Sequence, residues 1–421
     1  MKWYKRLERK IKTFRKNIQK NILEFFFVCR IGKDIVSGNK NRKFAFFTPL
    51  PPEKTGTALY ALKVYQYIFD ELDFIYDVYD IKKYCHALSF ISEKYHKNIL
   101  PLCMVQERKY KHFFLNLGNN CFHVPCLQYG IQTKGKDNRH IVLCETQLCG
   151  LLCSYYESRG VDFTRMLIKY YPEKNLCQEE LDSDFYGTLR NKNIFGIRIL
   201  IAITGISHFV LYRNIGRDLL FEDIKGSEYE NSVEISVIPM GIEKISMVPE
   251  PAALEEQGYN IGSFGIASDI KQTDKVIKAV DLLNRQGEKI TLWLAGYEVR
   301  KYADRFKSSN LRIVENPGYD SLLSLMNSVD MAVQLRKFSN GEGSGCIAEL
   351  IALNKNFIAT DNLFEPYYAS AGVSVSADCT VEELAGTIIK ELKKKTVRDN
   401  SAILKKYSFE NTAQAFKHTV A

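Results

Sequence analysis

The alternation of apolar and polar positions divides the chain into two successive α/β regions. In the first region, apolar runs of strand type cover residues 43–50, 74–78, 113–119, 140–145 and 233–243, with a further strongly apolar stretch at 197–212 and a helical pattern at 57–69. In the second region, apolar runs at 261–267, 290–296, 311–316, 330–336 and 356–362 alternate with helical patterns at 274–286 and 321–329. Strands that alternate with helices predict a parallel sheet in each region. A polar, proline-bearing stretch at 244–258 is the predicted linker.

The stretch 335–361, LRKFSNGEGSGCIAELIALNKNFIATD, combines a glycine-rich loop with the start of a helix and a following strand. Gly341, Gly343 and Gly345 have no side chain, so the backbone can approach a ligand closely there. The helix start offers unpaired N–H groups and the positive end of a dipole, which suit an anion. Glu342 and Glu349 add carboxylates that accept hydrogen bonds from hydroxyl groups. Together these groups suit a nucleotide-sugar; the alternative is an ordinary loop-to-helix joint of an α/β domain.

Length and composition fit two ordinary globular domains. The chain has 421 residues, 46% of them apolar, which is enough for two domains of about 150–200 residues each. Its eleven cysteines are odd in number, and none form the paired CxxC spacing of a zinc site. Cys144, Cys149 and Cys153 come close to helical spacing, where we expect them to act as small buried apolar residues. Free thiols in this number indicate a reducing compartment, hence the cytosol.

Positive charge is concentrated at the N-terminus. Residues 1–43 hold 14 Lys and Arg against 3 Asp and Glu, a net charge of +11, whereas the whole chain carries +9, so residues 44–421 carry about −2. Apolar residues recur in this segment at steps of three and four, the spacing of one helix face: Trp3, Leu7, Ile11, Phe14, Ile18, Ile22 and Phe25. A basic helix with Trp and Phe on its apolar side is typical of an anchor at a membrane surface.

The same segment is unsuited to two other roles. The apolar run at 22–31 is interrupted by Glu24 and Arg30 and is too short to span a bilayer. No small-residue cleavage site follows, as a secretory signal requires. We therefore expect residues 1–42 to attach the protein to an anionic membrane surface from the cytoplasmic side. The alternatives are a helix packed on the protein's own surface and, least favoured, a nucleic-acid arm; we expect no nucleic-acid partner.

Six motifs in a fixed order resemble the retaining glycosyltransferases of family 4, which have the GT-B fold of two facing Rossmann-like domains. They are TPLPPEKTGTALYA (48–61), LNLGNNCFH (115–123), ISVIPMGIE (235–243), IGSFGIASDIKQTDKVIKAVDLL (261–283), the stretch 335–361, and YSFENTAQAFKHT (407–419). The resemblance covers most of residues 44–418. It implies an α/β protein with an acceptor-binding domain at 43–250, a donor-binding domain at 251–405, and a closing helix at 406–421 that crosses back to the first domain. The basic amphipathic helix expected at 1–42 from its apolar spacing precedes these domains.

The resemblance also implies roles for individual residues. Lys271 stands where the family has a lysine that neutralises the donor diphosphate, and Glu349 stands at the second glutamate of the Glu-x7-Glu signature, which accepts hydrogen bonds from ribose. Gly56 belongs to the loop that closes over the donor phosphates. The other expected donor contacts are Gly265, Arg336, Gly341, Gly343 and Ser344, and the catalytic candidates beside Lys271 are Glu342 and His123. Because protein groups can stabilise the leaving nucleoside diphosphate, we expect no metal ion and no cofactor.

On the donor side the chain departs from the family pattern at two places. The first glutamate of the signature would fall at position 341, which is Gly341, and Glu342 is its neighbour. The arginine that often precedes the lysine is absent, because Ile266 occupies its place. Arg336 or Lys337 is the candidate to replace the charge of that arginine.

On the acceptor side, Cys144 and Glu145 stand where relatives carry His-Asp, which indicates an unusual acceptor or weakened catalysis. His123 has two interpretations, a group that reaches the reacting sugar or a histidine whose bonds are satisfied in the core, and we favour the second slightly. We expect His208, in an apolar stretch, to be structural. The triplet Asp182-Ser183-Asp184 matches the metal-binding motif of the other glycosyltransferase fold, but its polar surroundings predict a solvated loop.

We therefore expect a metal-independent, retaining hexosyltransferase that acts on the cytoplasmic face of the membrane. It would transfer a sugar from a nucleotide diphosphate donor to a lipid-linked or oligosaccharide acceptor in cell-surface polysaccharide assembly. One alternative is a non-catalytic GT-B-fold binding or scaffold subunit of a glycosyltransferase complex. Another is a nucleotide-sugar epimerase, against which the predicted anchor argues. The sequence contains no GxxxxGK[ST] phosphate loop, no HExxH and no GxSxG nucleophile motif.

Overall fold

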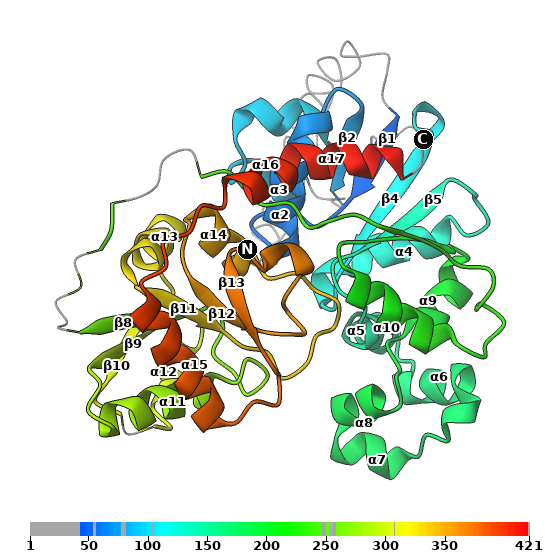
Figure 1. Ribbon diagram of the computed structural model, residues 1–421. Coiled ribbons are helices and arrows are strands. Elements are labelled where there is room, and N and C mark those ends of the chain that lie inside the picture. Colours follow the sequence, from blue (N-terminus) through cyan, green and yellow to red (C-terminus); the bar gives the residue numbers. More distant parts are fainter. Residues whose placement is uncertain are drawn as a thin grey trace, which may run out of the picture.

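The computed structural model describes residues 43–419, except 54–55, 77–80, 103–104, 106, 246–249, 253, 255–257 and 307. The predicted basic helix at 1–42 and part of the predicted linker lie outside the described residues. The rest of the chain forms two domains, each built on one parallel sheet (Figure 1). We call them the N-terminal and the C-terminal domain.

The N-terminal domain has a seven-stranded sheet in the order β3-β2-β1-β4-β5-β6-β7. Its strands are β1 (Phe44–Phe47), β2 (Leu72–Tyr76), β3 (Ile99–Pro101), β4 (His112–Leu117), β5 (Arg139–Leu143), β6 (His208–Leu211) and β7 (Glu234–Val237). Side chains along β1 alternate between two cores, with Phe44 and Phe46 on one face and Ala45 and Phe47 on the other. Because both faces are buried, every residue of β1 is apolar.

Helices cover both faces of this sheet. On one face lie α2 (Gly56–Tyr65) and α3 (Ile81–Leu88), and on the other lie α4 (Val124–Gln132), α5 (Cys149–Glu157), α9 (Ile197–Thr204) and α10 (Asn214–Ile224). Three short helices between α5 and α9 form a lobe that projects from the domain (Figure 1). They are α6 (Phe163–Tyr170), α7 (Gln178–Ser183) and α8 (Phe185–Asn191).

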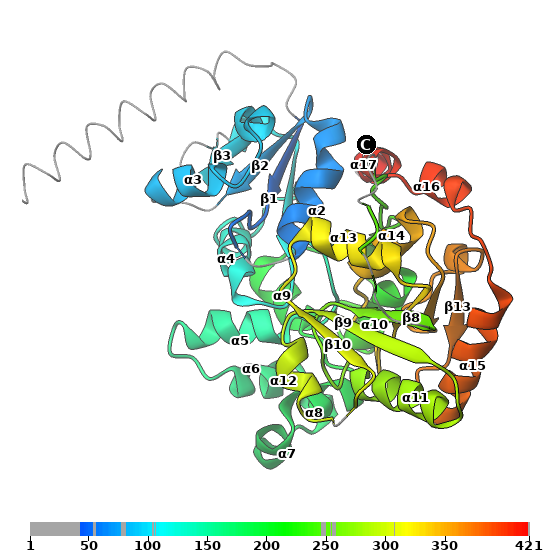
Figure 2. The same ribbon diagram turned by 90° about the vertical axis from the view of Figure 1, so that its left-hand side faces the viewer.

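The C-terminal domain has a six-stranded sheet in the order β10-β9-β8-β11-β12-β13. Its strands are β8 (Tyr259–Phe264), β9 (Ile290–Gly296), β10 (Leu311–Glu315), β11 (Met331–Gln334), β12 (Phe357–Thr360) and β13 (Gly372–Val375). The helices are α11 (Thr273–Arg285), α12 (Val299–Ala303), α13 (Tyr319–Ser328), α14 (Gly345–Ala352) and α15 (Val381–Lys394), and α16 (Ser401–Lys406) follows. In Figure 2, α13 and α14 lie on the side of this domain that faces α2.

The last helix, α17 (Phe409–His418), packs on the N-terminal domain although it follows the C-terminal domain in the chain. Its Phe416 is fully buried among Phe46, Tyr65 and Phe114. The Lys417 side chain adds an ion pair with Glu71. The chain therefore crosses between the domains a second time, through α16 and α17 (Figure 1).

The structure confirms the two predicted parallel sheets, assigns the apolar stretch at 197–212, and corrects one local prediction. The apolar stretch at 197–212 is a helix and a strand, α9 and β6, separated by a turn in which Gly205 has a φ of +71°. The triplet Asp182-Ser183-Asp184 is not a loop: it ends α7, and the Asp184 carboxylate caps the start of α8 by accepting from the N–H of Gly187. Within the described residues, no helix is both long and apolar enough to cross a membrane.

Candidate active site

A cleft of about 510 Å³ lies between the two domains. The loops and helix starts that line it follow β1, β7, β8, β9, β10 and β11, at the edge where parallel sheets of this type bind ligands. The N-terminal domain contributes Gly56, Leu59, Tyr60, Lys63, Met240 and Glu243, and the C-terminal domain contributes Lys271, Tyr297, Tyr319, Leu322, Arg336, Gly343, Ser344, Cys346 and Glu349, among others. Six residues expected from the sequence thus meet in one cavity: Gly56, Lys271, Arg336, Gly343, Ser344 and Glu349.

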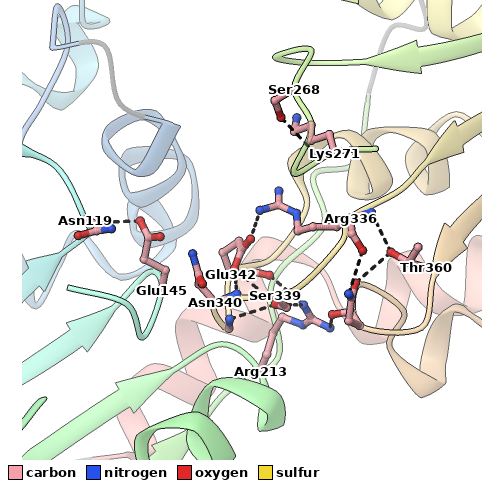
Figure 3. A network of polar contacts seen from close by, with 12 residues as sticks. Asn119, Glu145, Arg213, Ser268, Lys271, Arg336, Ser339, Asn340, Glu342 and Thr360 are labelled. Atoms are coloured by element: carbon pink, nitrogen blue, oxygen red, sulfur yellow. Dashed lines mark hydrogen bonds and ion pairs between the residues drawn. The ribbon is translucent and has the colours of Figure 1, made fainter. Parts of the chain in front are cut away.

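Lys271 and Arg336 place two positive charges at one end of the cleft. Figure 3 shows the Arg336 side chain extending toward the side on which Asn119 and Glu145 of the N-terminal domain lie, with Lys271 near it. Burial lowers the pKa of Lys271, and the nearby Arg336 lowers it further. Burial likewise lowers the pKa of Arg336. Two neighbouring buried cations repel each other, so an anion between them is favoured.

The turn between β8 and α11 fixes the position of Lys271. Its backbone N–H donates to the Ser268 hydroxyl at 3.2 Å, and Gln272 next to it has a φ of +48°. Gly265 does not line the cleft but borders a small adjoining cavity together with Lys271. A Cβ at Gly265 would lie 2.6 Å from the Lys271 Nζ, and the φ of Gly265 is +101°. Glycine at this position therefore leaves room for the lysine.

The start of α14 faces the same end of the cleft. The Ser344 hydroxyl caps this helix by accepting from the N–H of Ile347 at 3.3 Å. A Cβ at Gly343 would lie 1.9 Å from the Met240 Sδ, so glycine allows the two domains to approach here. The positive end of the helix dipole adds to the charges of Lys271 and Arg336.

The structure places Glu342 and Gly341 away from the cleft, which differs from the expectation. The Glu342 carboxylate pairs with the Arg336 guanidinium and accepts from the N–H of Asn340 at 2.6 Å (Figure 3). Gly341 is buried with a φ of +89°, and a Cβ at this position would lie 2.6 Å from the Cα of Gly216 in the N-terminal domain. Glu342 therefore contacts Arg336, which lines the cleft, and does not line the cleft itself. Gly341 lies where the two domains approach each other closely.

A buried arginine holds this loop against the N-terminal domain. Arg213, which follows β6, pairs with Glu365 and donates to the carbonyl oxygen of Glu342 at 2.9 Å and to that of Asn362 at 3.1 Å. The N–H of Thr146 donates to the carbonyl oxygen of Asn340 at 2.6 Å. The glycine-rich loop is thus part of the domain interface as well as a neighbour of the cleft.

Glu349 lines the cleft one turn along α14 from Cys346, so both residues lie on the same face of the helix. Burial raises the pKa of the Glu349 carboxyl to about 7. Lys63 and a hydrogen bond from Tyr319 lower this pKa, whereas Glu243 raises it. Cys346 lies close enough to Lys271 to interact with it electrostatically, and Glu349 follows one turn further along the same helix. The cleft is therefore lined both by cations and by a carboxylate.

Sequence reasoning did not identify Lys63, Glu243 and Tyr319. The Lys63 Nζ lies 2.5 Å from the Glu243 carboxylate and 4.7 Å from the centre of the Tyr319 ring. Lys63 lies in the last turn of α2 in one domain, and Tyr319 begins α13 in the other. No sequence signal marks this contact, because residues 256 positions apart meet only when the domains face each other.

His123 is fully buried and does not line the cleft. Its Nδ1 lies 2.8 Å from the carbonyl oxygen of Asn116, and its Nε2 lies 3.3 Å from the Thr57 hydroxyl at the start of α2. Burial lowers the pKa of His123 to about 4. This geometry favours the interpretation of His123 as a core histidine whose hydrogen bonds are satisfied, and disfavours a catalytic role. His208 also has a structural role, since its ring makes a hydrogen bond with the ring of His140 in the neighbouring strand.

Cys144 and Glu145 lie at the end of β5, facing the domain interface. The Cys144 thiol donates to the Asn116 side chain at 3.0 Å, and burial raises its pKa. The Glu145 carboxylate accepts from the N–H of Asn119 at 3.0 Å and lies near Arg336, while its burial raises its pKa. A carboxyl group of the N-terminal domain thus faces the cationic end of the cleft (Figure 3).

No protein-family model matches the chain, and no curated protein sequence matches it significantly. Solved structures are similar to it over 90% of its length. They include HepE from Anabaena in complex with UDP and glucose (13% identity, TM-score 0.57, 99% of that chain covered). A glycosyltransferase from Rickettsia africae (12%, 0.57, 98%) and sucrose-phosphate synthase from Thermosynechococcus elongatus (11%, 0.56, 98%) are also similar. The chain therefore has the GT-B fold of two facing Rossmann-like domains, as its motif order predicted.

Proposed function

We propose that this protein is a glycosyltransferase that takes its sugar from a nucleoside diphosphate donor. The observation that carries the proposal is the interdomain cleft, which is lined by the cations Lys271 and Arg336 and, one turn along α14 from Cys346, by the carboxylate of Glu349. Such a cleft matches the two halves of the donor, since a diphosphate is anionic and a ribose offers hydroxyl groups. Leu322 and the ring of Tyr319 form an apolar wall of the cleft that suits the base of the nucleotide.

In the proposed mechanism the sugar leaves the donor diphosphate and joins the acceptor with retention of configuration. Lys271, Arg336 and the start of α14 stabilise the negative charge that develops on the leaving diphosphate. The acceptor hydroxyl attacks from the same side and gives its proton to that diphosphate. Glu349 holds the ribose, and Gly56, which has open space around its Cα, lets the start of α2 approach the phosphates. Because protein cations supply the charge, we propose that transfer needs no metal ion and no cofactor.

The acceptor and the setting follow from the motif order and the basic N-terminus. We propose a hexosyl transfer to a lipid-linked or oligosaccharide acceptor in cell-surface polysaccharide synthesis, within the family 4 branch. Residues 1–42 would hold the enzyme at the cytoplasmic face of an anionic membrane. Flotation of the full chain with anionic vesicles tests this part, compared with a chain in which Trp3, Phe14 and Phe25 are serine. Equal flotation of the two chains would refute the anchor.

Thermal-shift screening against UDP, GDP, ADP, CDP and dTDP tests the donor class. One of these ligands at 100 times its Kd should stabilise the protein by about 2.7 kcal/mol. The matched variants Lys271→Ala and Glu349→Ala should lose the shift, whereas Lys278→Ala, on the exposed face of α11, should keep it. No shift with any diphosphate would contradict the proposal.

A non-catalytic subunit is the second candidate, and the specific observation in its favour is Cys144 in a position where relatives have histidine. Such a subunit would bind a nucleoside diphosphate yet release none from a nucleotide-sugar. Turnover of any nucleotide-sugar by the purified chain therefore separates the two functions.

A further inference from the structure

One contact joins the two domains across the ribose end of the cleft. The Lys63 side chain, 26% exposed, leaves the last turn of α2 and pairs with Glu243, which follows β7 in the same domain. The same ammonium lies 4.7 Å from the centre of the Tyr319 ring, which belongs to α13 of the C-terminal domain. A cation over an aromatic face is attractive, and the more so where water is partly excluded.

Tyr319 in turn lies beside the carboxylate proposed to hold the ribose. Tyr319 and Glu349 both line the cleft, and each is close enough to act on the pKa of the other. Lys63 and Glu349 therefore both lie beside one tyrosine, with Glu243 as the second carboxylate of the group. These four residues come from α2, the segment after β7, α13 and α14, so their arrangement exists only while the domains face each other.

We propose that Lys63 is a positioning residue for the nucleotide donor: it joins α2 to Tyr319 over the ribose end of the cleft and keeps Glu349 in the charged form that binds ribose. This inference rests on the proposed function. It goes beyond that function because it assigns to the N-terminal domain a residue that controls donor binding in the C-terminal domain.

The charges around Glu349 support this role. Burial favours the neutral carboxyl group, as does the neighbouring Glu243, and Cys346 on the same helix face lies within electrostatic range. Lys63 is the cation that lowers the pKa of Glu349, with the hydrogen bond from Tyr319 acting in the same direction. Lys271 and Arg336 also line the cleft, but the cation that acts on Glu349 is Lys63. Without Lys63, Glu349 should therefore ionise only at a higher pH.

The stability of the free protein should change little when Lys63 is replaced, because partly exposed ion pairs contribute little to folding. This separates a positioning role from a merely structural one. The structural role would move the melting temperature, whereas the positioning role moves the pH dependence of nucleotide binding. Arginine can restore both the charge and the contact with the ring, so Lys63→Arg serves as the conservative variant.

The test is calorimetric titration of UDP into the full chain between pH 6 and 9, for the wild type, Lys63→Met, Lys63→Gln, Lys63→Arg and Glu349→Gln. Lys278→Met, which removes an exposed lysine paired with Asp274 on α11, is the matched control. The β-phosphate of UDP itself titrates at about pH 6, so each curve is compared with that of Glu349→Gln.

We expect wild-type affinity to rise with pH, with a midpoint near the Glu349 pKa of about 7, and Glu349→Gln to lack this rise. Lys63→Met and Lys63→Gln should move the midpoint upward by about half a unit or more, which weakens binding about twofold at pH 7 and about threefold at pH 6. Lys63→Arg and Lys278→Met should follow the wild type. Unchanged midpoints in Lys63→Met and Lys63→Gln would overturn the inference and leave the proposed function standing. A wild type that binds neither UDP nor another nucleoside diphosphate would overturn both.

Discussion

At the scale of single residues, Glu349 combines a proposed binding role with a cost to the folded protein. Its pKa of about 7 exceeds the ordinary value of 4.5 because the carboxyl group is buried. The folded state therefore holds the proton more tightly than the unfolded state does. The resulting loss of stability is absent below about pH 4.5, grows as the pH rises, and is complete above about pH 7.

Glu349→Gln should therefore stabilise the free protein at pH 8 while it weakens nucleotide binding. Allowing for partial exposure, we expect a gain on the order of 2 kcal/mol at pH 8 relative to pH 5. Urea unfolding at the two pH values measures this difference, and Glu382→Gln on the exposed face of α15 is the control. A variant that is equally or less stable at pH 8 would contradict the account of this site.

Gly341 gives a second prediction at this scale. Gly341→Ala and Gly135→Ala both place a side chain at a positive φ, +89° and +86°, but only Gly341 has neighbours in the way. Its new methyl group would meet the Cα of Gly216 and the hydroxyl of Thr146, whereas the methyl group at Gly135 would meet nothing within 4 Å. We expect Gly341→Ala to cost about 1–3 kcal/mol more than Gly135→Ala in urea unfolding. Equal losses would show that the domains do not meet closely at this loop.

The sequence predicted some site residues because their positions depend on local structure. Lys271 and Glu349 follow a strand end and a helix start, and both lie in the cleft. Glu342 and Gly341 belong to the same loop, yet Arg213 and Gly216 draw that part of it into the domain interface. Contacts between distant segments decide whether a loop residue lines the cleft or lies in the domain interface. The spacing of residues along one segment does not predict those contacts.

At the scale of elements, α17 packs the C-terminal end of the chain against the N-terminal domain. Phe416 has ring-centre distances of 4.3 Å to Phe114 and 4.6 Å to Tyr65, and it is fully buried. Phe416→Ala should destabilise the N-terminal domain by about 3–5 kcal/mol, because a large cavity would remain in its core. Chemical unfolding measures the loss, and Val397→Ala, at a residue that is 94% exposed, should stay within about 0.5 kcal/mol of the wild type. A small loss at Phe416 would mean that α17 does not hold this core.

Helices and strands whose apolar residues recur with a clear period could be predicted from the sequence. Elements without such a period could not. The alternation of helices and strands gave both parallel sheets, since a strand buried on two faces is apolar throughout. The stretch 197–212 is equally apolar, but an apolar run without a period fits a buried helix as well as a strand. The lobe of α6, α7 and α8 was missed because its helices are only six to eight residues long and each buries only one or two residues.

At the scale of the whole molecule, the two domains form one site that neither contains alone. Arg213 with Glu365 and Thr146 with Asn340 hold the glycine-rich loop between them, and Lys63 with Tyr319 joins them at the other side of the cleft. The order of six motifs was sufficient to predict this GT-B architecture. It could not reveal the contacts that close the cleft, which depend on the relative position of the domains.

The most direct test of the central claim is the release of nucleoside diphosphate from a panel of nucleotide-sugars by the full chain. We predict release from at least one member of the panel and a loss of about a hundredfold or more in both Lys271→Ala and Glu349→Ala, with Lys278→Ala unchanged. Folding of the variants is checked by their unfolding transitions. Full activity in both variants would contradict the assignment of the cleft as the donor site. If the wild type releases no nucleoside diphosphate from any nucleotide-sugar, the proposal that the protein is a glycosyltransferase is contradicted.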